Sequence, residues 1–145
     1  KNELAQHVFD YCKQKNITVI YTSHTPEEIL MFSDLVIVLK EGKLMENDTP
    51  QNIYELPATE YIARLTGEVN LIPVRYFGVQ NDEVLLIRPH QLILSEEGIL
   101  GKVKKSYYKG FAYLITVQTD GFSFSIFHNQ PVSKDSLIRF SIKNK

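Results

Sequence analysis

The sequence has very little cysteine and no long hydrophobic run. Its 145 residues contain one cysteine, Cys12, so the chain can form no internal disulfide and lacks the paired cysteines of zinc and redox motifs. No apolar run approaches the roughly 18 residues that a membrane-spanning helix needs. These absences favour a globular protein of a reducing, cytosolic compartment.

Acidic residues are scarce in the last third of the chain. Residues 99–145 contain two acidic and eight basic residues, whereas residues 1–98 contain fifteen acidic and eight basic residues. The net charge of the whole chain is only −1, because the two parts nearly cancel. This asymmetry indicates either two surfaces with different partners or two parts whose surfaces face each other.

The first seventy residues alternate between helical and strand patterns. A β-branched run over 17–23 predicts a buried strand that delivers His24 to its C-terminal end. Pro26 predicts the first turn of a helix over 26–32, where its missing N–H costs nothing. The other elements predicted here are helices over 3–15, 49–55 and 58–66 and strands over 35–40 and 43–46.

The pattern changes after residue 70 to short strands separated by turn residues, which is typical of an all-β barrel or sandwich. The clearest hairpin signal is Thr119-Asp120-Gly121-Phe122, since Asp-Gly suits a type I′ turn. The predicted strands cover 71–77, 83–88, 91–94, 101–108, 111–119, 122–128 and 137–143.

Five segments of the first half follow one another at a distinctive spacing. The first segment, Thr18–Leu30, contains a strand ending in Ser23-His24 and a Glu-rich helix. It is followed by an Asp-led strand, a glycine turn, a Thr-Pro helix and a Gly-x-x-Asn exit, which are Asp34–Leu39, Glu41–Lys43, Asp48–Tyr54 and Gly67–Asn70.

In this order, the five segments resemble the C-terminal part of an ABC-transporter ATPase of the bacterial importer type. The resemblance implies that His24 is the switch histidine, which reaches the γ-phosphate of ATP and helps to position the attacking water. It also implies an α/β tail of the ATPase domain over residues 1–69. His24 is the one catalytic residue that the sequence predicts.

The resemblance also shows which nucleotide-binding motifs the chain lacks. It contains no G-x-x-x-x-G-K-S/T loop to cradle phosphates, no LSGGQ-like signature and no apolar strand ending in Asp-Glu. We therefore expect a C-terminal fragment of a longer protein. ATP and Mg²⁺ would be cofactors of that parent, and the fragment alone is predicted neither to bind nor to hydrolyse ATP.

The second half resembles, more loosely, a TOBE-type regulatory domain, which is an OB-like β-fold appended to importer ATPases. The similarity rests on Ile87-Arg88-Pro89, Leu92–Leu94 and Gly101-x-Val103. His90 stands where that family usually has an acidic residue, and the usual glycine near Asp135 is missing. The predicted second domain covers residues 70–145 and is an all-β, OB-like barrel.

Other titratable residues give weaker signals. Glu27 and Glu28 are adjacent on a predicted helix and point about 100° apart, so they fit a favourable interaction with the helix dipole better than an acid/base pair. His7, His90 and His128 lack the close spacing of zinc ligands. No metal site is predicted.

The resemblance implies membrane permease subunits and a second ATPase subunit as partners, in a homodimer that lies in the cytoplasm at the inner face of the cell membrane. A small effector on the β-domain stays open. The alternatives are a single-stranded nucleic-acid-binding module or a purely structural dimerisation module. We expect no nucleic acid, with the aromatic residues filling the barrel and the lysines solvated. The residues concerned are Lys102, Lys104, Lys105, Tyr107, Tyr108, Lys109, Phe111 and Tyr113.

Overall fold

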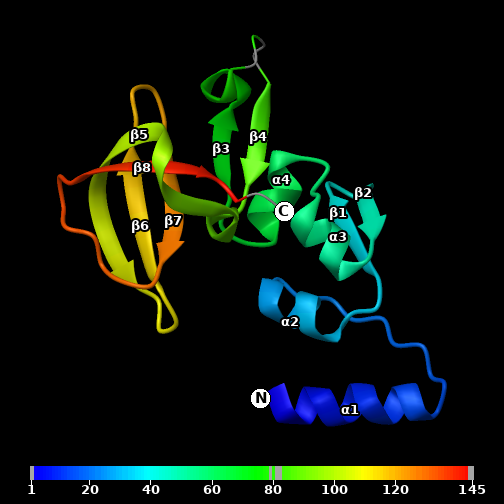
Figure 1. The fold of residues 1–145 in the computed structure, drawn as a ribbon. Coiled ribbons are helices and arrows are strands. Elements are labelled where there is room, and N and C mark those ends of the chain that lie inside the picture. Colours follow the sequence, from blue (N-terminus) through cyan, green and yellow to red (C-terminus); the bar gives the residue numbers. More distant parts are fainter. Residues whose placement is uncertain (1, 79, 81–82, 144–145) are drawn as a thin grey trace. The chain divides into compact units, whose positions relative to one another are not determined.

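The computed structural model describes residues 2–78, 80 and 83–143. The chain divides into two compact units, Lys1–Gly67 and Glu68–Lys145 (Figure 1). The predicted assignment of residues 1–69 to an ATPase tail and of residues 70–145 to a regulatory domain stays a prediction. No helix in the described part is long and apolar enough to cross a membrane.

The first unit consists of short helices and one β-hairpin. Strands β1 and β2 pair antiparallel, and the two-residue turn between them has positive φ at both Glu41 (50°) and Gly42 (73°). Those angles fit a type I′ turn, whose twist matches that of the flanking strands. The elements are α1 (Asn2–Gln14), α2 (Pro26–Phe32), β1 (Val36–Lys40), β2 (Lys43–Asp48), α3 (Pro50–Glu55) and α4 (Glu60–Leu65).

The predicted buried strand over 17–23 is wrong. These residues have no regular secondary structure in the described chain, and the side chain of Ile20 is 92% exposed. A run of β-branched residues becomes a strand only where a neighbouring strand accepts its hydrogen bonds, and β1 and β2 form a two-stranded sheet with each other alone.

The helices begin where local signals place them. The Thr49 hydroxyl accepts the Asn52 N–H at the start of α3, and the Thr59 hydroxyl accepts the Ile62 N–H at the start of α4. Each contact satisfies a backbone donor that the first turn of a helix leaves unpaired. The helices predicted over 26–32, 49–55 and 58–66 are therefore confirmed within one or two residues.

The core of the first unit is small. Val36, Val38, Ile53 and Ile62 form its buried cluster, with Ile29 packed against it. Helix α1 has apolar residues at four-residue spacing, of which Leu4 and Val8 are exposed and Cys12 is half-buried. Only part of the apolar surface of this unit is therefore covered by its own residues.

The second unit is a curled, half-barrel sheet of strand order β7-β6-β5-β8 with a separate β3–β4 hairpin (Figure 1). This mostly β architecture is compatible with the predicted OB-like fold. The elements are β3 (Asn70–Pro73), η1 (Val74–Phe77), β4 (Val84–Ile87), η2 (Pro89–Gln91), β5 (Leu92–Tyr108), β6 (Tyr113–Gln118), β7 (Ser123–His128) and β8 (Leu137–Ile142).

Strand β5 joins two strands that the sequence predicted separately, over 91–94 and 101–108. Leu94 and Ile99 both pair with Phe140 of β8, so the residues between them form an irregularity in one continuous strand. Such an irregularity bends a strand and increases its twist. The sheet curls because β5 continues through this bend.

The β6–β7 hairpin confirms the turn predicted at residues 119–122, with the Thr119 N–H donating to the Phe122 carbonyl at 2.9 Å. The predicted turn type is wrong, however. A type I′ turn needs positive φ at both central residues, and among the four described turn residues only Gly121 has it, at 118°.

The core of the second unit is a large cluster that unites both of its sheets. Fully buried residues of this kind each stabilise the folded state by roughly 1.5–3 kcal/mol before entropic costs. Asn70 links the sheets, because its side chain donates to the Ser125 carbonyl and accepts the Ser125 N–H, each at 2.7 Å. The cluster consists of Ile72, Ile87, Leu92, Val103, Ile115, Val117, Phe124, Ile126 and Phe140.

Candidate functional site

His24 lies at the end of the extended segment 17–23, immediately before helix α2. Burial alternates over residues 21–25, with Tyr21, Ser23 and Thr25 partly buried and Thr22 and His24 exposed, whereas residues 17–20 are all exposed. Residues 21–25 therefore keep the two-residue alternation of a strand, although they have no strand partner. This alternation presents the imidazole of His24 to solvent.

Side-chain hydrogen bonds fix the residues on either side of His24. The Ser23 hydroxyl donates to Glu28 Oε2 at 2.8 Å and accepts the Thr25 N–H at 3.1 Å. The first bond joins the segment to the first turn of α2, and the second closes a small turn around His24. The loop that carries the histidine is therefore held at both neighbouring positions.

Tyr21 makes a second connection between the segment and α2. Its hydroxyl donates to the Glu28 carbonyl at 3.2 Å and lies 2.7 Å from the Ser33 hydroxyl oxygen. The Tyr21 ring packs against Phe9 of α1, with 5.0 Å between centroids. Phe9 also stacks on Phe32 of α2, so these aromatic contacts attach the segment to both helices.

Sequence reasoning predicted His24 but missed Ser23 and Tyr21. The only local signal would have misled, since Thr25 and Glu28 have the S/T-x-x-E spacing of a capping box. In the structure Thr25 is the N-cap residue but its side chain makes no capping bond, and the Glu28 carboxylate accepts from Ser23 instead. This contact gives Glu28 a structural task, in line with the prediction that Glu27 and Glu28 are no acid/base pair.

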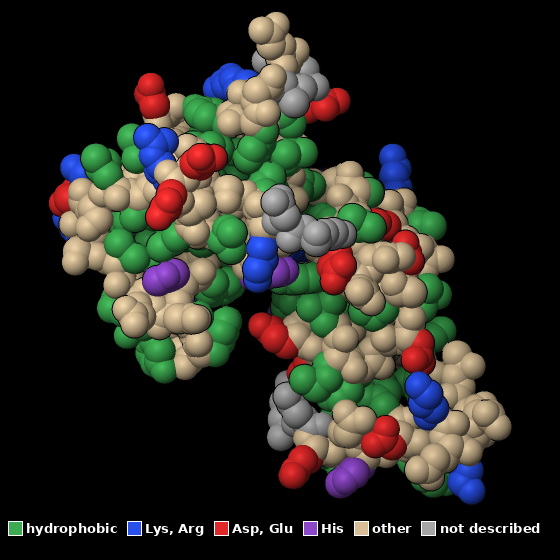
Figure 2. Space-filling model, in the orientation of Figure 1, with side chains coloured by type: hydrophobic (Ala, Val, Ile, Leu, Met, Phe, Trp, Pro, Cys, Tyr) green, Lys and Arg blue, Asp and Glu red, His purple; other side chains and the backbone are tan. Residues whose placement is uncertain are grey.

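The second unit contains a surface of lysines and aromatic rings, whereas the sequence predicted solvated lysines and aromatic residues inside the barrel. Tyr108 and Phe111 are 67% and 78% exposed, and Tyr107 is also exposed. Hydrophobic side chains accordingly reach the surface shown in Figure 2. The expectation that the aromatic residues fill the barrel is wrong for these three residues: Tyr107 and Tyr108 are the last two residues of β5, Phe111 lies in the β5–β6 connection, and all three are exposed.

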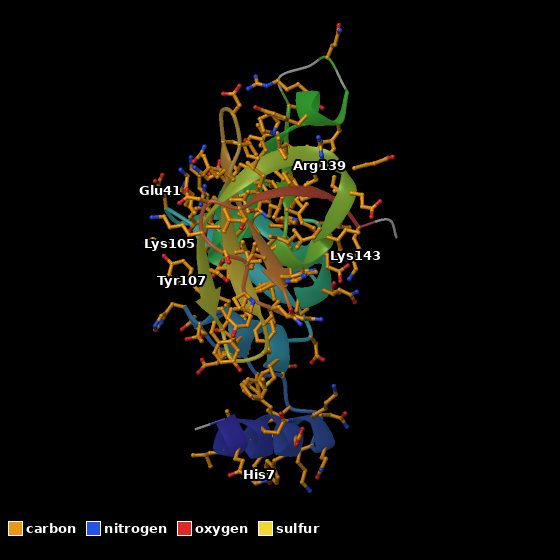
Figure 3. The ribbon with its side chains drawn as sticks, turned by 60° about the vertical axis from the view of Figure 1, so that its left-hand side comes forward. His7, Glu41, Lys105, Tyr107, Arg139 and Lys143 are labelled. Carbon is orange, nitrogen blue, oxygen red and sulfur yellow. The ribbon has the colours of Figure 1, made fainter. Side chains whose placement is uncertain are left out.

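This surface combines lysines with rings. Lys105 and Tyr107 are two residues apart on β5, and the Lys105 ammonium lies 5.7 Å from the centre of the Tyr107 ring (Figure 3). Phe111 lies against Phe127, with 5.3 Å between ring centroids. Residues 99–119 contain four lysines and no carboxylate, but Lys102 and Lys109 pair with Asp135 and Glu68, at 2.9 and 3.1 Å. The positive charge of this surface is therefore partly neutralised.

The other histidines do not form a metal centre within the described chain, where no group of three or more His, Cys, Asp or Glu side chains could hold an ion. His7 lies on α1 (Figure 3). His128 of β7 makes a local contact, since its Nδ1 lies 3.2 Å from the Gln130 nitrogen and 2.9 Å from the Gln130 carbonyl oxygen.

Comparison with known proteins finds relatives among import ATP-binding proteins. The Fe(3+) ions import ATP-binding protein FbpC of Rhizobium etli is 31% identical over 85% of this chain and 43% of its own length. The spermidine/putrescine import ATP-binding protein PotA of Acetivibrio thermocellus is 34% identical over 81% of this chain and 39% of its own length. FbpC of Escherichia coli K12 is 29% identical over 75% of this chain. No family model matches the sequence.

The chain spans about two fifths of the length of the curated relatives that it matches. The matched relatives cover both of its units, since alignments over 81–85% of the chain cannot lie within either unit alone. The resemblance predicted from the motifs around His24 is therefore confirmed, and the chain is a homologue of the ATP-binding subunits of ABC importers.

Proposed function

We propose that this chain is the switch-histidine portion, with a regulatory β-domain, of the ATP-hydrolysing subunit of a solute-import ABC transporter. Its relatives in iron and polyamine import support this function, and the solute would be of the iron, polyamine, sulfate or sugar type. The observation that carries the proposal is the exposed His24 at the end of an anchored, strand-like segment.

His24 would act on the terminal phosphate of ATP. An imidazole N–H can donate a hydrogen bond to an anionic oxygen, and this bond strengthens as charge builds during phosphoryl transfer. The bonds of the neighbouring Ser23 and Thr25 constrain the backbone that carries the ring, which limits the reorganisation needed at the moment of reaction. The phosphate loop, the magnesium ligands and the catalytic carboxylate would come from other parts of the subunit.

The test is to replace His24 by Ala in the longer subunit and to measure ATP hydrolysis and ATP binding separately. Loss of one preorganised donor to a developing charge slows turnover by about 10²- to 10³-fold. ATP affinity should change by no more than a few-fold, because the phosphate loop supplies ground-state binding.

His7→Ala is a matched control, because His7 is an exposed histidine on α1, away from the anchored loop. This variant should hydrolyse ATP at the normal rate. Normal turnover of the His24→Ala subunit would refute the proposed role, and equal losses in both variants would show a general effect of removing a histidine.

We further propose that residues 68–145 contribute to a homodimer of the subunit, which would bind the permease at the inner face of the membrane. The observation that favours this role is the exposed surface of Tyr107, Tyr108 and Phe111, since a dimer interface of this kind is enriched in aromatic residues. In the subunit, we expect replacement of both Tyr108 and Phe111 by Ser to weaken the dimer. The molar mass of the variant subunit, measured by light scattering, should then shift from that of a dimer towards that of a monomer.

Nucleic-acid binding is the alternative reading of the same surface. If it holds, a fluorescent oligothymidine should bind the chain at low salt and be released steeply between low and moderate salt. A monomeric wild-type chain that binds this oligonucleotide would contradict the dimer proposal, and no binding at low salt would remove the alternative.

A further inference from the structure

Two residues of the segment before α2, Tyr21 and Ser23, donate hydrogen bonds to Glu28. Ser23 donates to its carboxylate at 2.8 Å, and the Tyr21 hydroxyl donates to its carbonyl at 3.2 Å. Thr25 reaches the same group indirectly, because its N–H donates to the Ser23 oxygen at 3.1 Å. Glu28 therefore accepts hydrogen bonds from the segment through both its side chain and its backbone.

These contacts matter because no strand ladder holds the segment in the described chain. Residues 17–23 pair with neither β1 nor β2 in the described chain, so here side-chain bonds to α2 hold the backbone around His24. Residues 24 and 25 lie beyond the segment 17–23 and would still depend on these bonds if that segment paired with a strand of a longer subunit. The bond to a carboxylate is charge-assisted and is about twice as strong as a bond between neutral groups. The Ser23–Glu28 bond is thus a principal constraint on where the histidine lies.

We propose that Glu28 is a positioning residue that acts on His24 through Ser23, an inference that rests on the proposed function of His24. The Glu28 carboxylate fixes the Ser23 hydroxyl, which in turn fixes the Thr25 N–H. His24 lies between Ser23 and Thr25, so its backbone is constrained on both sides and its ring projects to the exposed face. No proton transfer by Glu28 is required in this arrangement.

Turnover of the longer subunit tests this role. Glu28→Ala removes the acceptor, and a displaced catalytic group can lower the rate by up to about 10²-fold. We expect a fall of about 10- to 100-fold in kcat with an unchanged KM for ATP. Glu28→Gln keeps an acceptor oxygen for the Ser23 hydroxyl and should restore kcat to within a few-fold of the wild-type rate.

Ser23→Ala removes the other partner of the same bond. It should lower kcat as Glu28→Ala does, and the double variant should be no slower than either single variant, because both changes break one connection. Glu27→Ala is the matched control, since Glu27 is the exposed neighbour of Glu28 in the first turn of α2. It should leave kcat unchanged.

A readout that is independent of activity uses the 145-residue chain itself. In a nuclear magnetic resonance relaxation measurement, Ser23→Ala and Glu28→Ala should increase the nanosecond mobility of the 22–25 backbone amides, and Glu28→Gln should not. If Glu28→Ala fails to fold, Ser23→Ala and Glu28→Gln still decide the question.

Several results would overturn the positioning role. These are a Glu28→Gln subunit as slow as Glu28→Ala, additive losses in the double variant, or unchanged mobility at residues 22–25. Failure of the proposed function is distinguishable, because it requires normal turnover of His24→Ala. A slow His24→Ala subunit combined with a normal Glu28→Ala subunit refutes the positioning role alone.

Discussion

The two units of this chain differ in how far they bury their own apolar residues. In residues 68–145, Phe140 is fully buried and lies in a cluster that joins both sheets. In residues 1–67, Ile37 is 59% exposed on strand β1, where it lies between the buried Val36 and Val38. Both units expose some apolar side chains, but the second unit has a large core of its own residues and the first has a small one.

Strand β1 shows what this difference means. Leu35–Leu39 is a continuous apolar run, which is typical of a strand covered on both faces. Val36 and Val38 on one face pack with Ile53 and Ile62, while the other face stays exposed. The first unit therefore contains more apolar residues than its own fold buries, as expected if it is part of a larger ATPase domain.

The largest difference in the free energy of unfolding is expected when a core side chain is removed from the second unit. Phe140→Ala removes a fully buried ring that lies 3.7 Å from Phe124 between centroids, and such changes lower the free energy of unfolding by about 3–5 kcal/mol. Ile37→Ala in the first unit should change it by less than about 0.5 kcal/mol. Urea unfolding monitored by circular dichroism measures both values, and equal effects would erase the distinction between the units.

A smaller loss of unfolding free energy is expected when a hydrogen-bonding side chain is removed from either unit. Asn70→Ala leaves the N–H and carbonyl of Ser125 without their 2.7 Å partners, and it should cost about 2–3 kcal/mol. Thr59→Ala removes one capping bond from α4 in the first unit and should cost about 1 kcal/mol. The same unfolding measurement checks the order, and a larger loss for Thr59→Ala would reverse the ranking of the two units.

The smallest effect concerns an exposed ion pair of the second unit. The hydrogen bond and positive charge of Lys102, 2.9 Å away, hold the pKa of Asp135 below its ordinary value. A depressed pKa means that the pair's contribution is present above the ordinary carboxyl pKa and is lost as the pH falls through the lowered value. Titration of Asp135 by nuclear magnetic resonance should show a rise in its pKa in Lys102→Met, and an unchanged value would show that the pair is absent in solution.

The sequence predicted those features that depend on neighbouring residues. Thr49 and Pro26 indicated where two helices begin, and Asp120-Gly121 located the β6–β7 turn. Each of these signals acts within four residues, through a cap, a ring or a turn conformation. Local chemistry was therefore sufficient to predict them.

Features that depend on distant partners were predicted less well. The strand over 17–23 needs a pairing partner, and the joining of two predicted strands into β5 depends on β8, some forty residues later. The exposure of Tyr108 and Phe111 follows from where the sheet ends rather than from their own spacing. His24 could be predicted from its motif, but its anchoring by Glu28 appears only when α2 folds back on the preceding segment.

Hydrogen exchange most directly tests the central proposal, that His24 and its neighbours contribute to the ATP site of a longer subunit. It would compare the 145-residue chain with the longer subunit, with and without ATP. We predict that the β5–β8 amides are protected in both proteins, and that residues 17–23 are protected only in the longer subunit. Residues 22–25 should gain further protection with ATP. Equally fast exchange of residues 17–25 in all samples would contradict the account.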